Sequence, residues 1–576
     1  MKTLTLLIVL ALFIQITVSS QPCLPDGIEF TTQEQINNFQ NNYPNCTEIE
    51  GNVTIAGEDI TNLNGLSVLT SIGGALTING DWGVTNSNLT SLTGLDNLTS
   101  IGGDLKIGTW AFGNPSLASL TGLDNVTTIE GNLYIESNNN LVSLTGLNNL
   151  SYLGGDLKMG HLHSDGVTEF YAFGNDLLTD LSALSNLDTI YGNISIADNN
   201  SLTSLAGLNI THINGNLQIG SNNSLVSITE LGFLNAVGGN LKIAGNHSLT
   251  SLDGLQNLSS IAGGLWIGKY LSDVGFVGNA SLTSLTGLDN LTSVGGSLNI
   301  VGNDSMTNLT GLENVTSVGG LSVRYNAALT SLSGLDNITF IEGGLWTQGN
   351  ISLISLSGLE NVTSIGGGLG IRGNTALTSL TGLDNLTSIG GNFYTLHNDA
   401  LTSFTGLENL TSIGGYLMIG GTNFNYGNPV LTSLTGLDNV ASIGGDLTIR
   451  YNISLATCEV QSICDYLIST NGVIEIHDNA PGCNSQSQVE AACLNTIVEE
   501  INGAGKYSIY PNPVTDIATF SSEEITSFEI YDMTGTLIMR RNSNKVDMSN
   551  LNPGIYFVIG FDKKLKPLYK GKIIKK

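Results

Sequence analysis

Basic side chains, and charged side chains of either sign, are scarce in this sequence. Its 576 residues include 19 Lys and Arg against 48 Asp and Glu, which gives a formal net charge of −29, and only 12% of the chain is charged. So acidic a chain repels a phosphate backbone, which argues against nucleic acid as a partner. The hydrophobic fraction of 41% is high and the 72 glycines follow no triplet period. The composition therefore predicts a packed core rather than a disordered or collagen-like chain.

Long apolar runs are also missing, with one exception at the N-terminus. After Met1 and Lys2 an apolar run covers residues 4–18 and is followed by Ser19 and Ser20. This is the pattern of a secretory signal peptide, so we expect residues 1–20 to be removed and the protein to be exported. Because no second run of about 18 apolar residues follows, no membrane-spanning helix is expected in the mature chain.

Cysteine is absent from the whole centre of the chain. The six cysteines form two groups that flank it, namely Cys23 and Cys46 before it and Cys458, Cys464, Cys483 and Cys493 after it. An exported chain favours disulfides over metal thiolates, and bridges at both ends suit caps that seal a repeat array. Four cysteines allow three pairings, which the sequence leaves open. A zinc site would need closer pairs of ligands than these.

What fills the centre is a repeat. The phrase SLTGLDNLTSIGG, or a near copy of it, returns most often after 23 or 24 residues, which predicts about sixteen coils. Within a coil the pair Leu105 and Ile107 alternates with period two, as in a short strand, and helical spacing is absent. The prediction is an all-β solenoid with capped ends.

An asparagine precedes the first leucine of each coil by three residues. It occurs in all fifteen coils that can be tested, at Asn86, Asn114, Asn138, Asn175, Asn199, Asn222, Asn246, Asn279, Asn303, Asn326, Asn350, Asn374, Asn398, Asn428 and Asn452. A side-chain amide offers two donors and an acceptor, so a stacked column of amides can satisfy backbone groups that have no other partner. We interpret this column as structural.

The coil pattern LxIxxNxxLxxLxxL resembles the leucine-rich repeat, and its IGGxLxI variant looks like bacterial receptor L-domain-like repeats. The resemblance covers about residues 50–456. It implies a right-handed solenoid with a parallel sheet along one face, at ~4.8 Å per coil and on the order of 75 Å long.

The last 70 residues differ from the repeat in charge and in pattern. Residues 505–576 hold 11 basic and 7 acidic side chains, so the net charge is +4 there and −33 in the rest of the chain. Strand-like runs predict a small antiparallel β-sandwich. The phrases YPNPVTD, FEIYDMTG and LNPGIYFV and the end KGKIIKK resemble the C-terminal sorting domain of the type IX secretion system. The motif positions are Tyr510, Pro511, Asn512, Pro513, Asp516, Gly535, Gly554 and Tyr556.

That resemblance implies a Gram-negative host, the type IX secretion machinery as a partner and a location outside the cell or on its outer surface. A permanent sandwich that serves adhesion is the alternative. The expected organisation is a signal peptide (1–20), an N-terminal cap (21–50), the repeat solenoid (51–456), a cysteine-containing C-terminal cap (457–494), a linker (495–505) and the sorting domain (506–576).

Motifs for chemistry are few. The sequence has no HExxH, GxSxG or Walker loop, so no enzyme, catalytic residue, metal site or cofactor is predicted. Two features leave alternatives open. His161 and His163 alternate as metal ligands on a strand can. An acidic residue also recurs at one coil position, where calcium bridging is the alternative to a solvated column; this column comprises Asp289, Glu313, Asp336, Glu360, Asp384, Glu408 and Asp438.

Five coils carry an insert between the strand and the asparagine, at residues 79–85, 108–113, 160–174, 268–278 and 420–427. Because the inserts leave at one coil position, they must line one edge of the sheet. Ten of their 47 residues are aromatic, a far higher share than the 6% of the whole chain. Outward strand positions add further aromatic residues beside Lys106, Lys158 and Lys242.

Aromatic faces beside an open sheet suit sugar rings or a protein partner. The candidate ligand-binding residues are Trp82, Trp110, Phe112, Tyr134, Phe170, Tyr171, Trp266, Tyr270, Phe276, Trp346, Tyr394, Phe424 and Tyr426. The simpler alternative is that the insert aromatics pack on one another. The sequence thus predicts a secreted or cell-surface protein for recognition or adhesion that binds an extracellular glycan or protein. A passive stalk and a polysaccharide-degrading β-helix enzyme are the other candidates.

Overall fold

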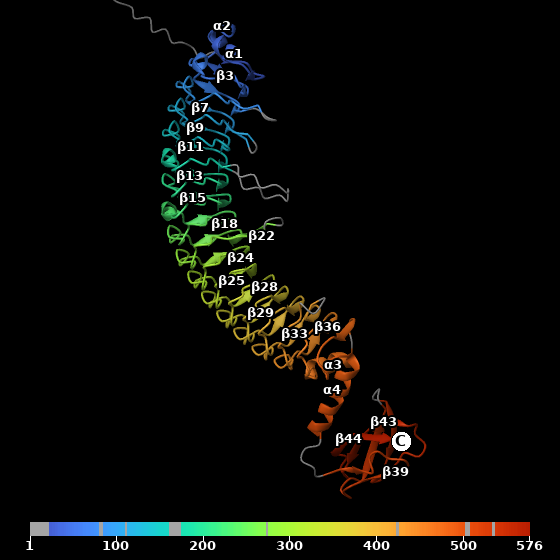
Figure 1. Ribbon diagram of the computed structural model, residues 1–576. Helices are drawn as coiled ribbons and strands as arrows, with labels where there is room; N and C mark the ends of the chain where they lie inside the picture. The colour runs from blue at the N-terminus through green and yellow to red at the C-terminus, as the bar shows by residue number, and fades with distance from the viewer. Residues whose placement is uncertain are drawn as a thin grey trace, which may run out of the picture. The chain divides into compact units, whose positions relative to one another are not determined.

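The structure is a computed structural model of the chain (Figure 1). It describes residues 22–79, 84–109, 112–160, 174–271, 275–421, 426–469, 471–501, 507–532 and 536–576, without the side chains of residues 270, 271, 275, 276 and 494–501. The signal peptide and several predicted residues lie outside this description: Trp82, Trp110, His161, His163, Phe170, Tyr171, Phe424, Gly535 and the side chains of Tyr270 and Phe276. The chain forms two compact units, Met1–Gly367 and Gly368–Lys576.

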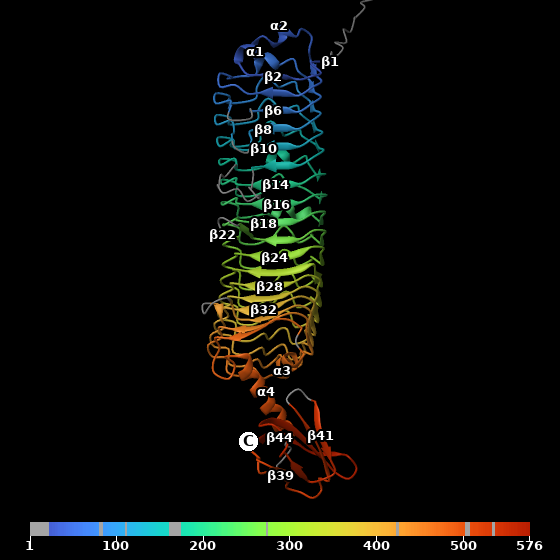
Figure 2. The same ribbon diagram turned by 90° about the vertical axis from the view of Figure 1, so that its right-hand side faces the viewer.

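The first unit is a stack of coils, each of which adds one strand to a long parallel sheet. Neighbouring strands pair in register, so the same coil position recurs from strand to strand. The sheet lies on the inner side of the curve of this unit (Figures 1 and 2). In order its strands are β2 (Ile28–Phe30), β4 (Val53–Ile55), β6 (Leu76–Ile78), β8 (Leu105–Ile107), β10 (Leu133–Ile135), β12 (Leu157–Met159), β14 (Ile194–Ala197), β16 (Leu217–Gly220), β18 (Leu241–Ala244), β20 (Leu265–Ile267), β24 (Ser297–Val301), β26 (Gly320–Arg324) and β28 (Leu345–Gln348).

A second set of strands, each two residues long, runs beside the first. These short strands also pair in parallel. They are β1 (Pro22–Cys23), β3 (Glu48–Ile49), β5 (Ser71–Ile72), β7 (Ser100–Ile101), β9 (Thr128–Ile129), β11 (Tyr152–Leu153), β13 (Thr189–Ile190), β15 (His212–Ile213), β17 (Ala236–Val237), β19 (Ser260–Ile261), β23 (Ser293–Val294), β25 (Ser317–Val318), β27 (Phe340–Ile341) and β29 (Ser364–Ile365). The remaining elements of the unit are the hairpin β21 (Lys269–Leu271)–β22 (Gly275–Val277), the helices α1 (Gln33–Asn37) and α2 (Phe39–Asn42), and the 3-10 turns η1 (Asn64–Leu66), η3 (Ser182–Leu184) and η4 (Thr229–Phe233).

The core consists of the every-third apolar residues of the coil. In one coil Leu249, Leu252, Leu255 and Leu258 are fully buried, as are the two inward residues of the following main-sheet strand, Leu265 and Ile267. Tight turns join these leucines, which explains a spacing that fits neither a helix nor a strand. The all-β solenoid expected from the repeat is confirmed.

The asparagine column supplies buried hydrogen bonds that join the coils inside this core. Asn222 is fully buried and accepts hydrogen bonds from the backbone N–H of Asn199 (3.1 Å) and from its Nδ2 (3.3 Å). Its own Nδ2 donates to the carbonyl of Ile196 (2.9 Å) and to Oδ1 of Asn246 (3.3 Å). The same pattern repeats along the first unit, so the predicted structural role of the column is confirmed.

The paired glycines of the repeat permit close stacking of the coils. A Cβ atom at Gly131 would lie 2.5 Å from Oδ1 of Asp104 and 2.7 Å from the carbonyl carbon of Gly103 in the preceding coil. That Oδ1 accepts the backbone N–H of Asn132 at 2.9 Å, so a side chain at Gly131 would break a bond between coils.

The second unit begins with five more parallel main-sheet strands, β30 (Leu369–Arg372), β32 (Phe393–Leu396), β34 (Leu417–Ile419), β36 (Leu447–Arg450) and β37 (Ile474–His477). The short strands β31 (Ser388–Ile389), β33 (Ser412–Ile413) and β35 (Ser442–Ile443) accompany them. Helix α3 spans Gln461–Ile468. Helix α4 spans Gln486–Ile501 and so extends into the stretch suggested as a linker.

Disulfides close both ends of the repeat. Cys23 pairs with Cys46 in the first unit. In the second unit Cys458 pairs with Cys483, and Cys464 with Cys493. The pairing that the sequence left open thus ties helix α3 to helix α4.

The C-terminal module is a two-layered antiparallel β-sandwich. One sheet contains β38 (Ile509–Tyr510), β39 (Ile517–Phe520) and β42 (Lys545–Asp547). The other contains β41 (Leu537–Arg541), β40 (Ser527–Tyr531), β43 (Gly554–Phe561) and β44 (Pro567–Lys575). Side chains of both sheets, among them Phe520 and Phe528, share one core.

The sorting motif holds the last strand of this module. Asn512 donates its Nδ2 to the carbonyl of Lys572 at 2.6 Å, and its Oδ1 accepts the backbone N–H of Ile574 at 2.8 Å. The carbonyl of Asp516 accepts the N–H of Met548, and the hydroxyl of Tyr556 donates to the carbonyl of Asn552. Tyr510 is exposed. Across the described parts of both units, we find no helix that combines the length and the hydropathy needed to cross a membrane.

The asparagine column predicts a stability difference between two adjacent asparagines. Replacing Asn222 with Ala leaves buried donors and an acceptor without partners, so we expect the free energy of unfolding to fall by about 3 kcal/mol. Replacing the exposed neighbour Asn223, whose Nδ2 bonds only the side chain of Asn200, should cost less than about 1 kcal/mol. Urea unfolding of the two variants measures both values, and equal losses would contradict the structural role of the column.

Candidate binding groove on the sheet face

The outward positions of the main sheet form a continuous row in the first unit. The register aligns Lys242 of β18 with Trp266 of β20, then with Asn299 of β24, Ser322 of β26 and Trp346 of β28. Because strands are ~4.8 Å apart, Trp266 and Trp346 are separated by three spacings, or about 14 Å. Two large aromatic side chains therefore flank two small polar ones.

A groove of about 620 Å³ lies over this row. Trp266 and Trp346 stand at its two sides, and its floor includes Asn299, Ser322 and Gly320. Pockets that bind small molecules in other proteins have volumes of about 300–1,000 Å³. The groove is thus large enough for a few rings of a ligand.

Both tryptophan rings lie over glycines of their own coils. A Cβ atom at Gly264 would be 2.6 Å from the ring of Trp266, and one at Gly344 would be 2.8 Å from Nε1 of Trp346. Many other coils have Asn or Asp at this coil position, as at Asn240. Glycine there lets each indole ring lie back along its strand.

Positive charge gathers at the groove. Lys242, Lys269 and Arg324 line it, and none of the described lining residues is acidic. The Nζ of Lys242 lies 5.3 Å from the centroid of the Trp266 ring, a cation–π contact. The Nε of Arg324 is buried and has no hydrogen-bond partner among the described residues. The groove therefore offers cationic groups to a ligand.

A second aromatic position, Tyr134, has different surroundings. Lys106 and Lys158 lie 5.8 and 5.7 Å from its ring centroid. Each lysine is paired with a carboxylate, Lys106 with Asp104 at 3.0 Å and Lys158 with Glu136 at 2.6 Å. Burial, with Asp156, Asp104 and Glu136 nearby, raises the pKa of Tyr134. Burial also raises the pKa of Glu136, against the opposing effect of Lys158. Each lysine beside Tyr134 is therefore neutralised by a carboxylate.

The other predicted ligand-binding residues are spread over both units. Phe112 is exposed in the first unit, and its carbonyl accepts a hydrogen bond from Asn79. Tyr394 lies on β32 in the second unit, aligned with Gly370 and Met418. The ring of Tyr426 lies 5.5 Å from the guanidinium of Arg372 and contacts His397 edge to face. Within the described residues, the structure brings only Trp266 and Trp346 of the predicted set together in one groove.

The side chains of the acidic column accept hydrogen bonds from backbone N–H groups in their own turns. The backbone N–H of Gly287 donates to Asp289 at 2.8 Å, and the same bond recurs at Glu313, Asp336, Glu360, Asp384, Glu408 and Asp438. In one coil the neutral Gln256 accepts the N–H of Gly254 in the same way. An oxygen acceptor, rather than a charge, is what this position requires. Among the described residues, no group of three or more His, Cys, Asp and Glu side chains is placed to hold a metal ion.

The asparagine that follows the acidic residue also has a structural role. Nδ2 of Asn314 donates to the carbonyl of Asp289 in the preceding coil at 2.6 Å, and Asn97 and Asn290 make equivalent bonds. The recurrent Asn-Leu-Thr sequence is therefore explained by a bond between coils.

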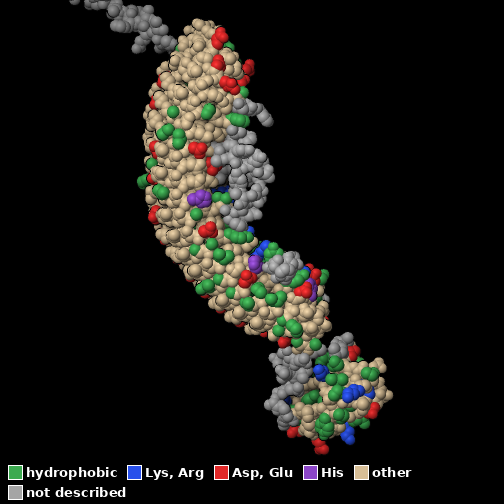
Figure 3. Space-filling view, in the orientation of Figure 1, with side chains coloured by type: hydrophobic (Ala, Val, Ile, Leu, Met, Phe, Trp, Pro, Cys, Tyr) green, Lys and Arg blue, Asp and Glu red, His purple; other side chains and the backbone are tan. Residues whose placement is uncertain are grey.

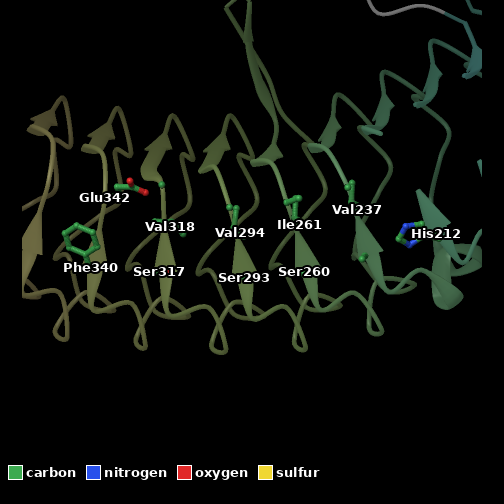
Figure 4. Close-up of a pocket in the computed structure, with 15 residues that line it drawn as sticks. His212, Val237, Ser260, Ile261, Ser293, Val294, Ser317, Val318, Phe340 and Glu342 are labelled. Carbon is green, nitrogen blue, oxygen red and sulfur yellow. The ribbon is translucent and has the colours of Figure 1, made fainter. Parts of the chain in front are cut away.

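A second groove, of about 490 Å³, runs along the short strands from β15 to β27 (Figure 4). His212 lies at one end of it, and Phe340 and Glu342 lie at the other. Its floor contains Val237 and Val294, at a position where other coils carry the longer isoleucine. Smaller core side chains thus account for this depression, which has neither paired aromatic walls nor a cluster of cations.

Space-filling shows how little charge the coils present (Figure 3). Most of the visible coil surface is backbone and uncharged polar side chains, with scattered acidic groups. Against this surface, the cationic groove on the sheet face is a local exception.

Sequence reasoning missed three features of this groove: Lys269, Arg324 and the glycines beneath the indole rings. Lys269 lies in an insert and Arg324 at the end of a strand, so neither occupies the central strand position that carries Lys106, Lys158 and Lys242. Alignment of the coils by position would have revealed Gly264 and Gly344 beside the two tryptophans.

Comparison with protein families divides the chain in the same way. Residues 508–576 match the secretion system C-terminal sorting domain. Residues 45–113 and 97–209 match the receptor L domain, and residues 296–425 match the BspA type leucine rich repeat region in six copies. A search of curated protein sequences finds no match.

Two solved structures are similar to this chain. One is a leucine-rich repeat protein from Bacteroides ovatus, with 14% identity, a TM-score of 0.25, and coverage of 65% of this chain and 79% of that chain. The other is the functional domain of InlJ from Listeria monocytogenes, which includes a cysteine ladder, with 14% identity, a TM-score of 0.17, and coverage of 89% and 91%. The sorting domain indicates a protein that is secreted or displayed at the cell surface. The chain therefore combines a repeat region whose segments are similar to the receptor L domain and to the BspA type leucine rich repeat with a type IX secretion system C-terminal sorting domain.

Proposed function

We propose that this protein is a recognition or adhesion protein on the outer surface of a Gram-negative cell, or released from it, and that it binds a glycan or protein ligand through the sheet face. The groove between Trp266 and Trp346 carries the proposal. Large, rigid aromatic side chains give much contact area at a low cost in conformational entropy, and their flat faces suit sugar rings and apolar side chains alike.

One of the insert loops contributes to the same surface. The insert at residues 268–278 forms the antiparallel hairpin β21–β22, which begins directly after Trp266 and its strand β20. Lys269 on this hairpin lines the groove. Binding residues often lie on loops that a rigid scaffold positions, and the solenoid is such a scaffold. We infer that the aromatic inserts extend the surface beyond the groove.

The composition of the groove favours binding over catalysis. General acid–base catalysis requires a group whose pKa lies near the working pH, usually histidine or a carboxyl group. The described residues that line the groove include neither. A passive stalk is the remaining alternative, and it predicts that the tryptophans can be removed without any effect on binding.

Replacement of the groove tryptophans should remove ligand capture and leave the fold intact. We expect the Trp266→Ala and Trp346→Ala variants to lose binding by at least about tenfold, with little change in melting temperature, because both rings are on the sheet surface. The measurement is saturation binding of the full mature chain to glycan and extracellular-protein arrays. Phe340→Ala, at an exposed aromatic residue beside the second groove, is the matched control. The absence of saturable binding to either array would favour the stalk.

The glycine beneath Trp346 provides a subtler test. A methyl group at residue 344 collides only with the Trp346 ring among the nearest atoms, so Gly344→Ala should tilt the indole ring without disturbing the core. We expect binding to weaken by about as much as in Trp346→Ala, roughly tenfold, while the melting temperature stays close to that of the wild type. Unchanged binding would show that the orientation of this ring is unimportant.

A further inference from the structure

The basic residues of the repeat region lie almost entirely on main-sheet strands. Between residues 21 and 505 the chain contains seven Lys and Arg: Lys106, Lys158, Lys242, Lys269, Arg324, Arg372 and Arg450. Six lie on main-sheet strands, and Lys269 lies on the hairpin that directly follows strand β20. Among the Asp and Glu of this stretch that the structure describes, only Glu29 and Glu475 lie on main-sheet strands. The two signs of charge are thus separated within the coil.

Neighbouring carboxylates neutralise several of these cations, but within the described residues Lys242 and Arg324 have no such partner. Lys106 and Lys158 each form an ion pair, and Arg450 pairs with Glu475 in the second unit. Within the described residues, Lys242 contacts the Trp266 ring and forms no ion pair, and Arg324 forms none either. A buried guanidinium nitrogen without an acceptor is costly. Lys242 and Arg324 both line the groove, so a ligand lying in it can supply acidic partners to both.

We propose that the groove between Trp266 and Trp346 binds an acidic polysaccharide, whose sugar rings stack on the indole faces and whose carboxylate or sulfate groups pair with Lys242 and Arg324. The proposal rests on the recognition function above and names its ligand class. Charged hydrogen bonds to guanidinium and ammonium groups are the strong ones, and a planar guanidinium matches a carboxylate or a sulfate.

Charge complementarity supports an anion despite the acidity of the whole protein. The long-range field of a chain with a net charge of −29 repels anions, and salt screens that repulsion beyond ~10 Å. Close to the groove the nearby unneutralised cations prevail. A neutral ligand would gain no ion pair from these cations, whereas an anionic ligand on the two tryptophans would.

The position of the groove favours a polysaccharide over an acidic peptide. An extended peptide gains affinity by adding a strand to a free sheet edge, whereas this groove lies on the face of a sheet whose strands already pair on both sides. Its floor combines the hydrogen-bonding groups of Asn299, Ser322 and several glycines with the apolar residues Ile219, Ala244, Val301 and Leu321. Hydroxyl-rich rings between two aromatic walls match such a floor.

The test compares four soluble polymers against the full mature chain. Polygalacturonate carries carboxylates, dextran sulfate carries sulfates, dextran is the neutral polysaccharide and poly-L-glutamate is the acidic peptide. We expect binding to one or both of the acidic polysaccharides, and a loss of about tenfold or more when salt rises from roughly 0.05 to 0.3 M. Dextran and poly-L-glutamate should bind at least about tenfold more weakly.

The variants use the chain's own matched control. Lys242→Gln combined with Arg324→Gln should weaken binding of the acidic polysaccharide by about tenfold or more, whereas Lys106→Gln combined with Lys158→Gln removes the same charge from the ion-paired cluster around Tyr134 and should change it by less than about threefold. Thermal melting of both double variants establishes that they fold. Equal losses in the two would mean a diffuse charge effect and would overturn the proposal.

The remaining outcomes separate this inference from the recognition function. Tryptophan-dependent binding of neutral glycans or proteins alone leaves recognition standing and refutes the acidic ligand. Binding of poly-L-glutamate as tight as that of the polysaccharides makes the ligand a peptide and also refutes it. If no ligand on any array or among the polymers binds in a tryptophan-dependent way, both proposals are wrong.

Discussion

Every coil of this protein must stack on its neighbours at the spacing of β-strands, and the asparagine column makes that stacking stable. At each turn the buried amide replaces the hydrogen-bond partners that water would otherwise supply. Two further columns, the Asn or Asp after the paired glycines and the asparagine after the acidic residue, repeat the device at other corners of the coil. Because the amide of each coil bonds the next one, the last coil needs another partner, and Asn479 in the disulfide-closed segment that follows accepts the bonds of Asn452.

Stacking in register also creates the groove. A residue at a given strand position lies beside its equivalents in adjacent coils, so separate substitutions in different repeats combine into one surface. Trp266 and Trp346 are 80 positions apart in the sequence, yet only two strands lie between them. Residues at the outward strand positions do not pack in the core, so they can differ from coil to coil and still combine into one surface.

The repeat predicted the core far better than the site. The period of 23 or 24 residues, the buried leucines and the asparagine column all depend on contacts between equivalent positions, and such contacts leave a periodic signal in one sequence. The role of the acidic column was harder to predict from the sequence, because only the hydrogen bond from Gly287 to Asp289 shows why an acceptor is needed there. The pairing of the cysteines depends on how the segments at the two ends of the repeat fold, and these segments carry no periodic signal in the sequence. Arg324 was overlooked because its meaning lies in its neighbours on other strands rather than in its own repeat.

The placement of the basic residues on the strands affects how the protein orients near a charged surface. With cations on the strands and carboxylates concentrated in the turns, the coils of the first unit carry an electric dipole directed across their stack. In the field of a negatively charged surface such a dipole experiences a torque that turns the sheet toward that surface before any contact forms. This orienting effect would weaken as the ionic strength rises.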